Sequence, residues 1–205
     1  MNQNVVSFSD YDNRFKQINN LQPFVLVSMG GRSGTDFLQS LLDTHEEVLS
    51  FNGHLKLYVD FFNKSKCLKH MPIDLQDIAI EFVGHYIERF NSKYDFIERK
   101  DQLGESGKDY LKINPQKFIK SFTSLLQNQS HTKKNILLGI HAAYHESMGY
   151  NFDKLKILFY HAHHFDEVYK FIEEFSTATI ICTTRDPRAG FVSTIENWKK
   201  YDELD

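Results

Sequence analysis

The sequence is short of the features that mark several protein classes. It has only two cysteines, Cys67 and Cys182, and Cys182 lies inside an apolar run, so a disulfide framework is not expected. It has no run of about 18 apolar residues and no basic–apolar leader, the marks of a membrane-spanning helix and a secretory signal. A net charge of −3 lacks the positive excess of broad nucleic-acid binders. We therefore expect a cytoplasmic protein without a membrane or nucleic-acid partner.

The composition is otherwise that of an ordinary globular protein. Of the 205 residues, 41% are hydrophobic and 25% are charged. This length is enough for one domain with a sizeable core, so we predict a single domain over residues 1–205. The 18 phenylalanines fall mostly at helix-face positions, which assigns them to that core.

Residues 24–42 have the pattern of a buried strand, a glycine-rich turn and a helix. Residues 24–29 (FVLVSM) form a nearly continuous apolar run, as in a parallel strand covered on both faces. The turn GGRSGT follows, and the apolar residues after it recur at the spacing of a helix face: Phe37, Leu38, Leu41 and Leu42. Such a turn aims backbone N–H groups and a helix N-terminus at one point and so favours an anion site. A structural turn without a ligand is the alternative.

Strand and helix patterns then alternate along the chain. Apolar or β-branched runs predict strands at 48–51, 135–140, 156–160 and 179–184, and amphipathic periodicity predicts helices at 75–90, 115–126, 164–175 and 188–201. Residues 5–8 are compatible with a short edge strand, 55–62 with further helix, and the charged segment 95–109 with a surface loop. Polar residues follow several strands, which indicates an open parallel α/β sheet with its site at that edge.

The glycine-rich turn does not fit the nucleoside-triphosphate P-loop. When the second glycine of that motif is laid on Gly34, Met29 stands at its first glycine. Thr35 then replaces the lysine that reaches the γ-phosphate, and Asp36 replaces the hydroxyl that binds magnesium. A P-loop kinase is therefore disfavoured.

A second strand, turn and helix pattern follows at residues 179–201. Arg185 comes at the end of the strand, Pro187 suits the first helical turn, and Arg188 and Ser193 come from the helix. Guanidinium groups and a hydroxyl near the start of a helix suit a phosphate group, because one guanidinium group can donate two parallel hydrogen bonds to two phosphate oxygens. Surface arginine pairing with Asp186 or Glu196 is the alternative.

Together, the two stretches resemble the PAPS-dependent sulfotransferases. Residues 32–38 (RSGTDFL) resemble the 5′-phosphosulfate loop of that family, [RK]-S-G-T-T-x-L. Arg185 and Ser193 keep the spacing of its 3′-phosphate motif, R-[ND]-P-R-x-x-x-x-S. The resemblance implies an α/β three-layer, P-loop NTPase-like fold with a central parallel sheet. It also implies transfer of a sulfuryl group from PAPS to a small-molecule or glycan acceptor, with no metal required.

The resemblance also assigns roles to single residues. Arg32 would stabilise the leaving phosphate, and the turn that includes Gly31, Ser33, Gly34 and Thr35 would cradle the 5′-phosphate with its backbone N–H groups. Arg185 and Ser193 would hold the 3′-phosphate. Asp36 stands where the family has a second threonine, so it either caps the helix or weakens donor binding by repulsion.

A histidine would act as the general base, since imidazole titrates near neutral pH. His163 lies 22 residues before Arg185, where the cytosolic branch of the family has its base, and His54 matches the position of a glutamate base in other branches. His141, His161 and His164 are further candidates, and a zinc site from His161, His163 and His164 is an alternative.

The family usually continues beyond its 3′-phosphate helix with a loop that closes over the nucleotide, whereas this sequence stops at Asp205. We therefore also consider a non-catalytic module that binds a nucleotide or a partner.

Overall fold

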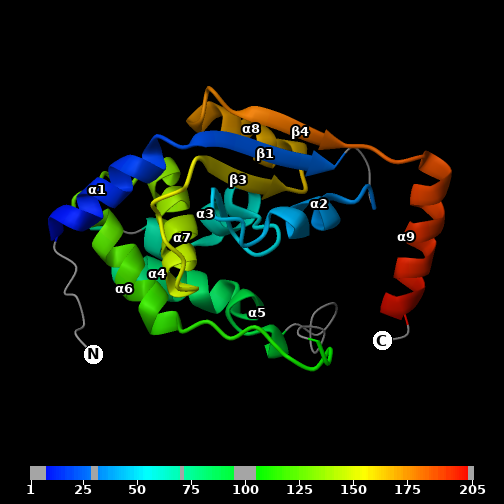
Figure 1. Ribbon diagram of the computed structural model, residues 1–205, viewed down its shortest axis with the longest axis horizontal. Helices are drawn as coiled ribbons and strands as arrows, with labels where there is room; N and C mark the ends of the chain where they lie inside the picture. Colours follow the sequence, from blue (N-terminus) through cyan, green and yellow to red (C-terminus); the bar gives the residue numbers. More distant parts are fainter. Residues whose placement is uncertain (1–7, 29–31, 70–71, 95–104, 203–205) are drawn as a thin grey trace.

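The computed structural model describes residues 8–28, 32–69, 72–94 and 105–202. Its centre is a sheet of four parallel strands in the order β2-β3-β1-β4 (Figure 1). The strands are β1 (Gln22–Ser28), β2 (Val48–Ser50), β3 (Ile157–Ala162) and β4 (Thr179–Thr183). In the register, Leu26 of β1 is opposite His161 of β3 and Ile181 of β4. The predicted parallel α/β sheet is confirmed.

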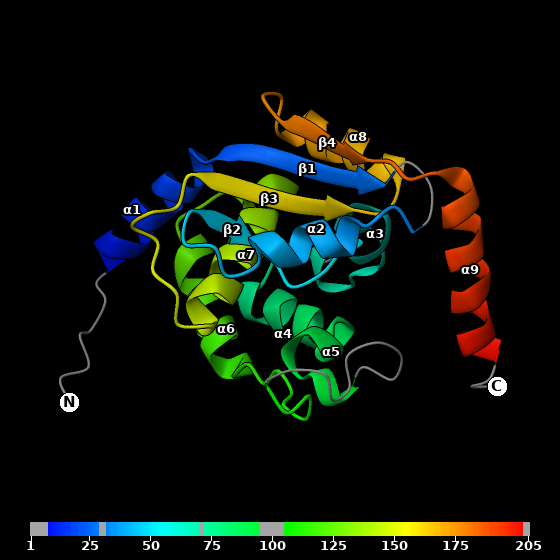
Figure 2. The same ribbon diagram turned by 45° about the vertical axis from the view of Figure 1, so that its right-hand side comes forward.

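The central strand β1 is buried on both faces. Val25 and Val27 belong to the larger apolar cluster, which contains residues of α7 (Lys133–Ser147) and α8 (Phe165–Glu174). Leu26 belongs to a smaller cluster, against which Leu38 and Leu42 of α2 (Thr35–Leu42) pack. Successive residues of a strand point to opposite faces, so helices cover the sheet on both sides (Figure 2).

The other helices build the layer below the sheet, or project from it. They are α1 (Phe8–Asn19), α3 (Phe62–Lys64), α4 (Leu75–His85), α5 (Ile87–Phe90), α6 (Pro115–Leu126) and α9 (Pro187–Asp202), with a π-helical turn at Leu57–Phe61 and 3₁₀ turns at Cys67–Lys69 and Ser92–Tyr94. Helix α9 stands apart at one side of the molecule (Figures 1 and 2). None of the helices in the described ranges is long and apolar enough to cross a membrane.

Helix α7 corrects the strand predicted at 135–140. Thr132 caps the helix, since its hydroxyl accepts a hydrogen bond from the Asn135 N–H. The helix is buried almost all round, so its run of apolar residues has neither the helical nor the strand period. An apolar run of this kind does not distinguish a buried strand from a buried helix.

Three other expectations change in detail. The helix predicted over 75–90 begins as expected, with the Asp74 carboxylate capping α4, but it is interrupted at Tyr86, where φ is −120°. Strand β4, which the apolar and β-branched run at 179–184 predicted, is an exposed strand at the edge of the sheet. The helix face predicted after the glycine turn is also wrong in part, because Phe37 is 69% exposed while Thr35 and Gln39 are buried.

Some predictions fall partly on residues outside the described ranges. Residue Phe8 begins helix α1, which no pattern predicted, and residues 5–7 of the proposed edge strand lie outside the described residues. Residues 95–104 of the predicted loop lie outside them as well. In the segment 55–62, the expected helical continuation is a π-helical turn, Leu57–Phe61.

Gly139 allows α6 and α7 to pack closely. A Cβ atom at this position would lie 2.8 Å from Cδ1 of the buried Leu126 side chain. We therefore expect Gly139→Ala to lower the free energy of unfolding by about 1 kcal/mol, because overpacking outweighs the better helix propensity of alanine. Urea denaturation measures this change. Gly84→Ala is the control: it lies in α4 with open space around it and should stabilise the chain by about 0.5–1 kcal/mol.

Candidate functional site

The candidate site is a cavity at the carboxyl ends of the parallel strands. Strand β1 leads into α2 on one face of the sheet, and the neighbouring β3 leads into α8 on the other face. Adjacent strands whose connections leave to opposite faces open a crevice between them, the usual ligand site of such sheets. The cavity has a volume of about 640 Å³ and is lined by Ser28, Arg32, Gly34, Thr35, Asp36, Phe37, His163, Phe165, Arg185 and Ser193.

The loop between β1 and α2 has an unusual backbone. Arg32 has a φ of 61°, a left-handed conformation that is uncommon for a side chain other than glycine. Gly34, the N-cap of α2, has a φ of 89° and supplies no side-chain cap. The first N–H groups of a helix have no partner within it, so this loop leaves donors for an anion. Strain of this kind is held by surrounding structure and is commonly found at binding sites.

Hydroxyl groups fasten this loop to the two strands beneath it. The Ser33 Oγ lies 2.6 Å from Ser28 Oγ at the end of β1 and 2.8 Å from Thr183 Oγ1 at the end of β4. Ser33 therefore does not line the cavity but holds the loop in place. Gly31, the other predicted loop residue, lies outside the described residues.

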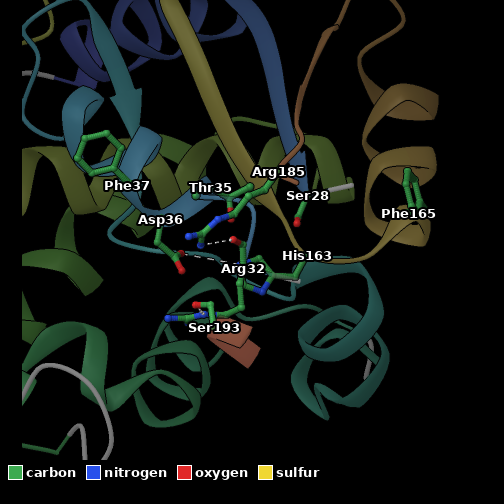
Figure 3. Close-up of a pocket in the computed structure, with 10 residues that line it drawn as sticks. Ser28, Arg32, Thr35, Asp36, Phe37, His163, Phe165, Arg185 and Ser193 are labelled. Carbon is green, nitrogen blue, oxygen red and sulfur yellow. Dashed lines mark hydrogen bonds and ion pairs between the residues drawn. The ribbon is translucent and has the colours of Figure 1, made fainter. Parts of the chain in front are cut away.

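The two predicted phosphate motifs meet in this cavity. Nη1 of Arg185 donates a hydrogen bond to the Arg32 carbonyl oxygen at 3.3 Å, and Nε of Arg32 lies 3.4 Å from Ser193 Oγ on α9 (Figure 3). Both guanidinium groups are exposed. Arg188, by contrast, binds the Asp186 carboxylate with two donors, as the surface alternative predicted, and does not line the cavity.

His163 is the histidine that faces the cavity. About a third of its side chain is exposed, and its ring stacks on that of His54, with centroids 3.6 Å apart and planes 15° from parallel. Burial is the main cause that lowers the pKa of His54 to about 2, and a proton on the stacked His163 ring would disfavour a second proton on His54. Burial also lowers the pKa of His163, against a smaller opposite effect of Asp36. Both rings are therefore neutral near pH 7, the form that accepts a proton.

The rings of His54, His161 and His163 contact one another and form a histidine cluster. Gln39, which no sequence pattern indicated, holds His161 and the segment before His54 in place. Its buried amide nitrogen donates to the carbonyl oxygens of Phe51 (2.6 Å) and Gly53 (3.2 Å), which fixes the segment before His54. Its Oε1 accepts a hydrogen bond from Nδ1 of the buried His161 at 2.5 Å. The signal available in the sequence was a polar residue four positions after Thr35, on the same face of a helix.

A second buried polar group fixes the segment that follows His54. The hydroxyl of Tyr160 on β3 donates to the Leu55 carbonyl oxygen at 2.9 Å and also to the carboxylate of Glu167. Glu167, on α8, accepts a further bond from the Val59 N–H at 2.7 Å. The π-helical turn is thus attached to the sheet at the edge of the histidine cluster.

The remaining histidine candidates lie elsewhere. His141 is buried in α7, where its Nδ1 donates to the Leu137 carbonyl oxygen, so the prediction that it ends a strand is wrong. His164 is the exposed N-cap residue of α8. Among the described residues, the group that is spaced for a metal ion is Asp36, His161 and His163, with Asp36 in the place that the sequence alternative gave to His164.

The cavity can therefore bind an anion and take up a proton. Two arginines and the N-terminus of α2 supply positive potential, and a neutral imidazole faces the same space. Asp36 adds one carboxylate, 3.9 Å from His163 Nε2. No family model, curated protein or solved structure matches this chain.

Proposed function

We propose that this chain is a sulfotransferase, which moves the sulfuryl group of PAPS to a hydroxyl or amine of a small-molecule or glycan acceptor. One observation carries the proposal. Arg32 and Arg185, which belong to two separate phosphate motifs and are 153 residues apart in the sequence, touch each other in one cavity. A ligand with phosphate groups at two positions would use both motifs. A turn with a purely structural role would not need two arginines in one cavity.

The fold that we propose is the three-layer, P-loop NTPase-like arrangement. It is supported by a parallel sheet with helices on both faces and by a glycine-containing turn between β1 and α2. The order of elements, strand, anion-binding turn and helix, is repeated at β4 and α9.

The residues of the cavity fit such a donor. A volume of about 640 Å³ is in the range of nucleotide and cofactor pockets. The backbone N–H groups of Gly34 and Thr35 would hold the 5′-phosphate beside Arg32, and Arg185 with Ser193 would hold the 3′-phosphate. Guanidinium groups at both positions favour dianionic phosphates over a neutral ligand.

In the proposed reaction the acceptor oxygen or nitrogen attacks the sulfur atom in line with the bond that breaks. The new bond joins the acceptor to sulfur, and the bond from sulfur to the bridging oxygen of the 5′-phosphate breaks. Nε2 of His163 takes the acceptor proton, and Arg32 stabilises the negative charge that develops on the leaving phosphate. The products are the sulfated acceptor and adenosine 3′,5′-bisphosphate.

Calorimetric titration with adenosine 3′,5′-bisphosphate tests the donor site. We expect the wild-type chain to bind it and Arg185→Ala to bind it about 10- to 100-fold more weakly, since a hydrogen bond to a charged group contributes about 1.5–3 kcal/mol. Arg188→Ala is the matched control, because Arg188 is an exposed arginine three residues away that pairs with Asp186. Absence of binding at millimolar ligand would overturn the assignment.

Two further measurements separate the sulfotransferase from the alternative functions. Tighter binding of magnesium ATP than of the bisphosphate would favour a kinase. Bisphosphate binding without transfer to any acceptor, measured with labelled PAPS, would favour a non-catalytic nucleotide-binding module.

A further inference from the structure

A second cavity lies beside the edge strand β2, apart from the anion-binding loop. Its volume is about 230 Å³, and it is lined by residues of β2, of the loop before it and of the C-terminal end of α7. Strand β2 and helix α7 are in contact with each other (Figure 2). The described residues that line this cavity share no member with those of the anion-binding cavity. It is therefore a separate place for a ligand.

The walls of this second cavity are largely apolar. Val48, Leu111 and Met148 supply aliphatic side chains, and Tyr144 and Tyr150 supply aromatic rings. The Tyr150 side chain is 38% exposed, which leaves the cavity reachable from solvent. Pockets for drug-sized ligands have volumes of about 300–1,000 Å³. The smaller volume of this cavity therefore suits a molecule with one ring and a short chain.

His145 gives this cavity a buried hydrogen-bond acceptor. The residue is only 6% exposed, and its ring lines the cavity. Its Nε2 lies 2.9 Å from the Asn151 carbonyl oxygen, which can only accept, so Nε2 carries the proton. Burial lowers the pKa of His145, and the ring is neutral near pH 7 with its lone pair on Nδ1. No residue in the described part of the chain donates a hydrogen bond to that nitrogen.

A buried acceptor of this kind needs a donor from outside the chain. A water molecule that fills such a place requires two to four polar partners. Apolar walls instead favour a ligand that carries an apolar body and one O–H group. The hydroxyl of such a ligand would donate to Nδ1 of His145, while its ring would contact Tyr150 and the aliphatic side chains.

The remaining polar groups of the cavity indicate the charge of the ligand. Thr44, Ser50 and Asn52 are uncharged, and the Ser50 hydroxyl donates to Asp43 Oδ1 at 3.3 Å. The Asp43 carboxylate repels an anion. A cation would have to give up its hydration against apolar walls, which is costly. An uncharged ligand avoids both penalties.

We propose that this cavity binds a small, uncharged aromatic alcohol, whose hydroxyl donates a hydrogen bond to Nδ1 of His145. The site goes beyond the proposed transfer reaction and does not rest on it, since the two cavities have no lining residue in common among those described.

The test is binding of three probes of matched size by the full chain, without any nucleotide. The probes are 2-phenylethanol, the cationic 2-phenylethylamine and the anionic phenylacetate, each titrated by calorimetry and by saturation-transfer NMR. We expect the alcohol to bind at least about ten-fold more tightly than either charged probe, because only the charged groups pay a large desolvation cost. Absence of saturable binding of the alcohol would overturn the proposal, as would tighter binding of a charged probe.

Two variants locate the bound probe. His145→Gln keeps an amide donor for the Asn151 carbonyl oxygen but loses the acceptor at Nδ1, so 2-phenylethanol should bind about 2- to 10-fold more weakly. Tyr150→Ala removes a partly exposed ring from the wall and should weaken binding by a similar factor of about 2 to 10.

Tyr110→Ala is the matched control for Tyr150→Ala. Tyr110 is similarly exposed, at 36%, and is not among the residues that line the cavity. This variant should bind 2-phenylethanol like the wild type. Circular dichroism checks that each variant is folded. Equal affinities of folded Tyr150→Ala and wild type would show that the probe does not bind in this cavity.

Discussion

Arg32→Ala is expected to lower the rate of the proposed sulfuryl transfer by about 10²–10³-fold, the usual effect of removing one group that stabilises charge in a transition state. The guanidinium group of Arg32 lines the cavity and is exposed, with a long hydrogen bond to Ser193. An exposed side chain contributes little to stability, so the free energy of unfolding should change by less than about 0.5 kcal/mol. The measurement is single-turnover transfer from labelled PAPS, together with urea denaturation.

Two comparisons make this result specific. Arg188→Ala removes the same charge from an exposed position outside the cavity and should retain the wild-type rate. Arg32→Lys keeps the charge but loses the planar pair of donors, so it should recover part of the rate only. If Arg32→Ala turned over like the wild type while folded, the leaving phosphate would not lie at this loop.

The buried His141 is expected to make the chain sensitive to acid. Burial in α7 lowers its pKa from the ordinary value of 6.5 to about 4. Between these two values the unfolded chain binds a proton that the folded chain does not, so stability falls as the pH falls. This contribution is intact above pH 6.5 and is lost progressively down to pH 4, by about 3 kcal/mol at about 1.4 kcal/mol per pH unit.

Urea denaturation at several pH values measures the effect. Wild type should lose about 3 kcal/mol more than His141→Gln between pH 7 and pH 4, because glutamine keeps a donor for the Leu137 carbonyl oxygen but does not titrate. The control His131→Gln changes a partly exposed histidine and should follow the wild type. Parallel curves for wild type and His141→Gln would show that His141 is not the group that takes up the proton.

Much of the candidate site was predictable, because its positions follow from local patterns. The glycine turn after a buried strand, and an arginine at the end of a later strand, predicted two anion-binding segments. In a parallel sheet the carboxyl ends of the strands share one edge, so Arg32 and Arg185 could be expected to meet there. His163, by contrast, was selected through the resemblance to the sulfotransferases, in which one branch has its base 22 residues before the corresponding arginine, and the structure places His163 at the cavity.

The wrong predictions share one physical cause. Local sequence does not show which residues will be buried by tertiary packing. Helix α7 is surrounded by other elements, so its apolar residues show no period, and residues 135–140 were predicted as a strand. On α2, Thr35 and Gln39 are buried and Phe37 stays exposed. The hydrogen bonds of Gln39 to the Phe51 carbonyl oxygen and to His161 turn this face of the helix towards the protein interior. Strand β4 looks like a core strand but lies at the edge of the sheet.

By itself, the sequence determined the parallel α/β class, the glycine turn before α2 and the two arginine segments, because short-range spacing and backbone chemistry define these features. Only the tertiary structure decided which histidines cluster and what lies beside them. His54 stacks on His163, Gln39 orients His161, and Asp36 takes the place that the sequence suggested for His164. These residues come from three segments, and their contacts depend on strand order and on helix rotation, which no local pattern encodes.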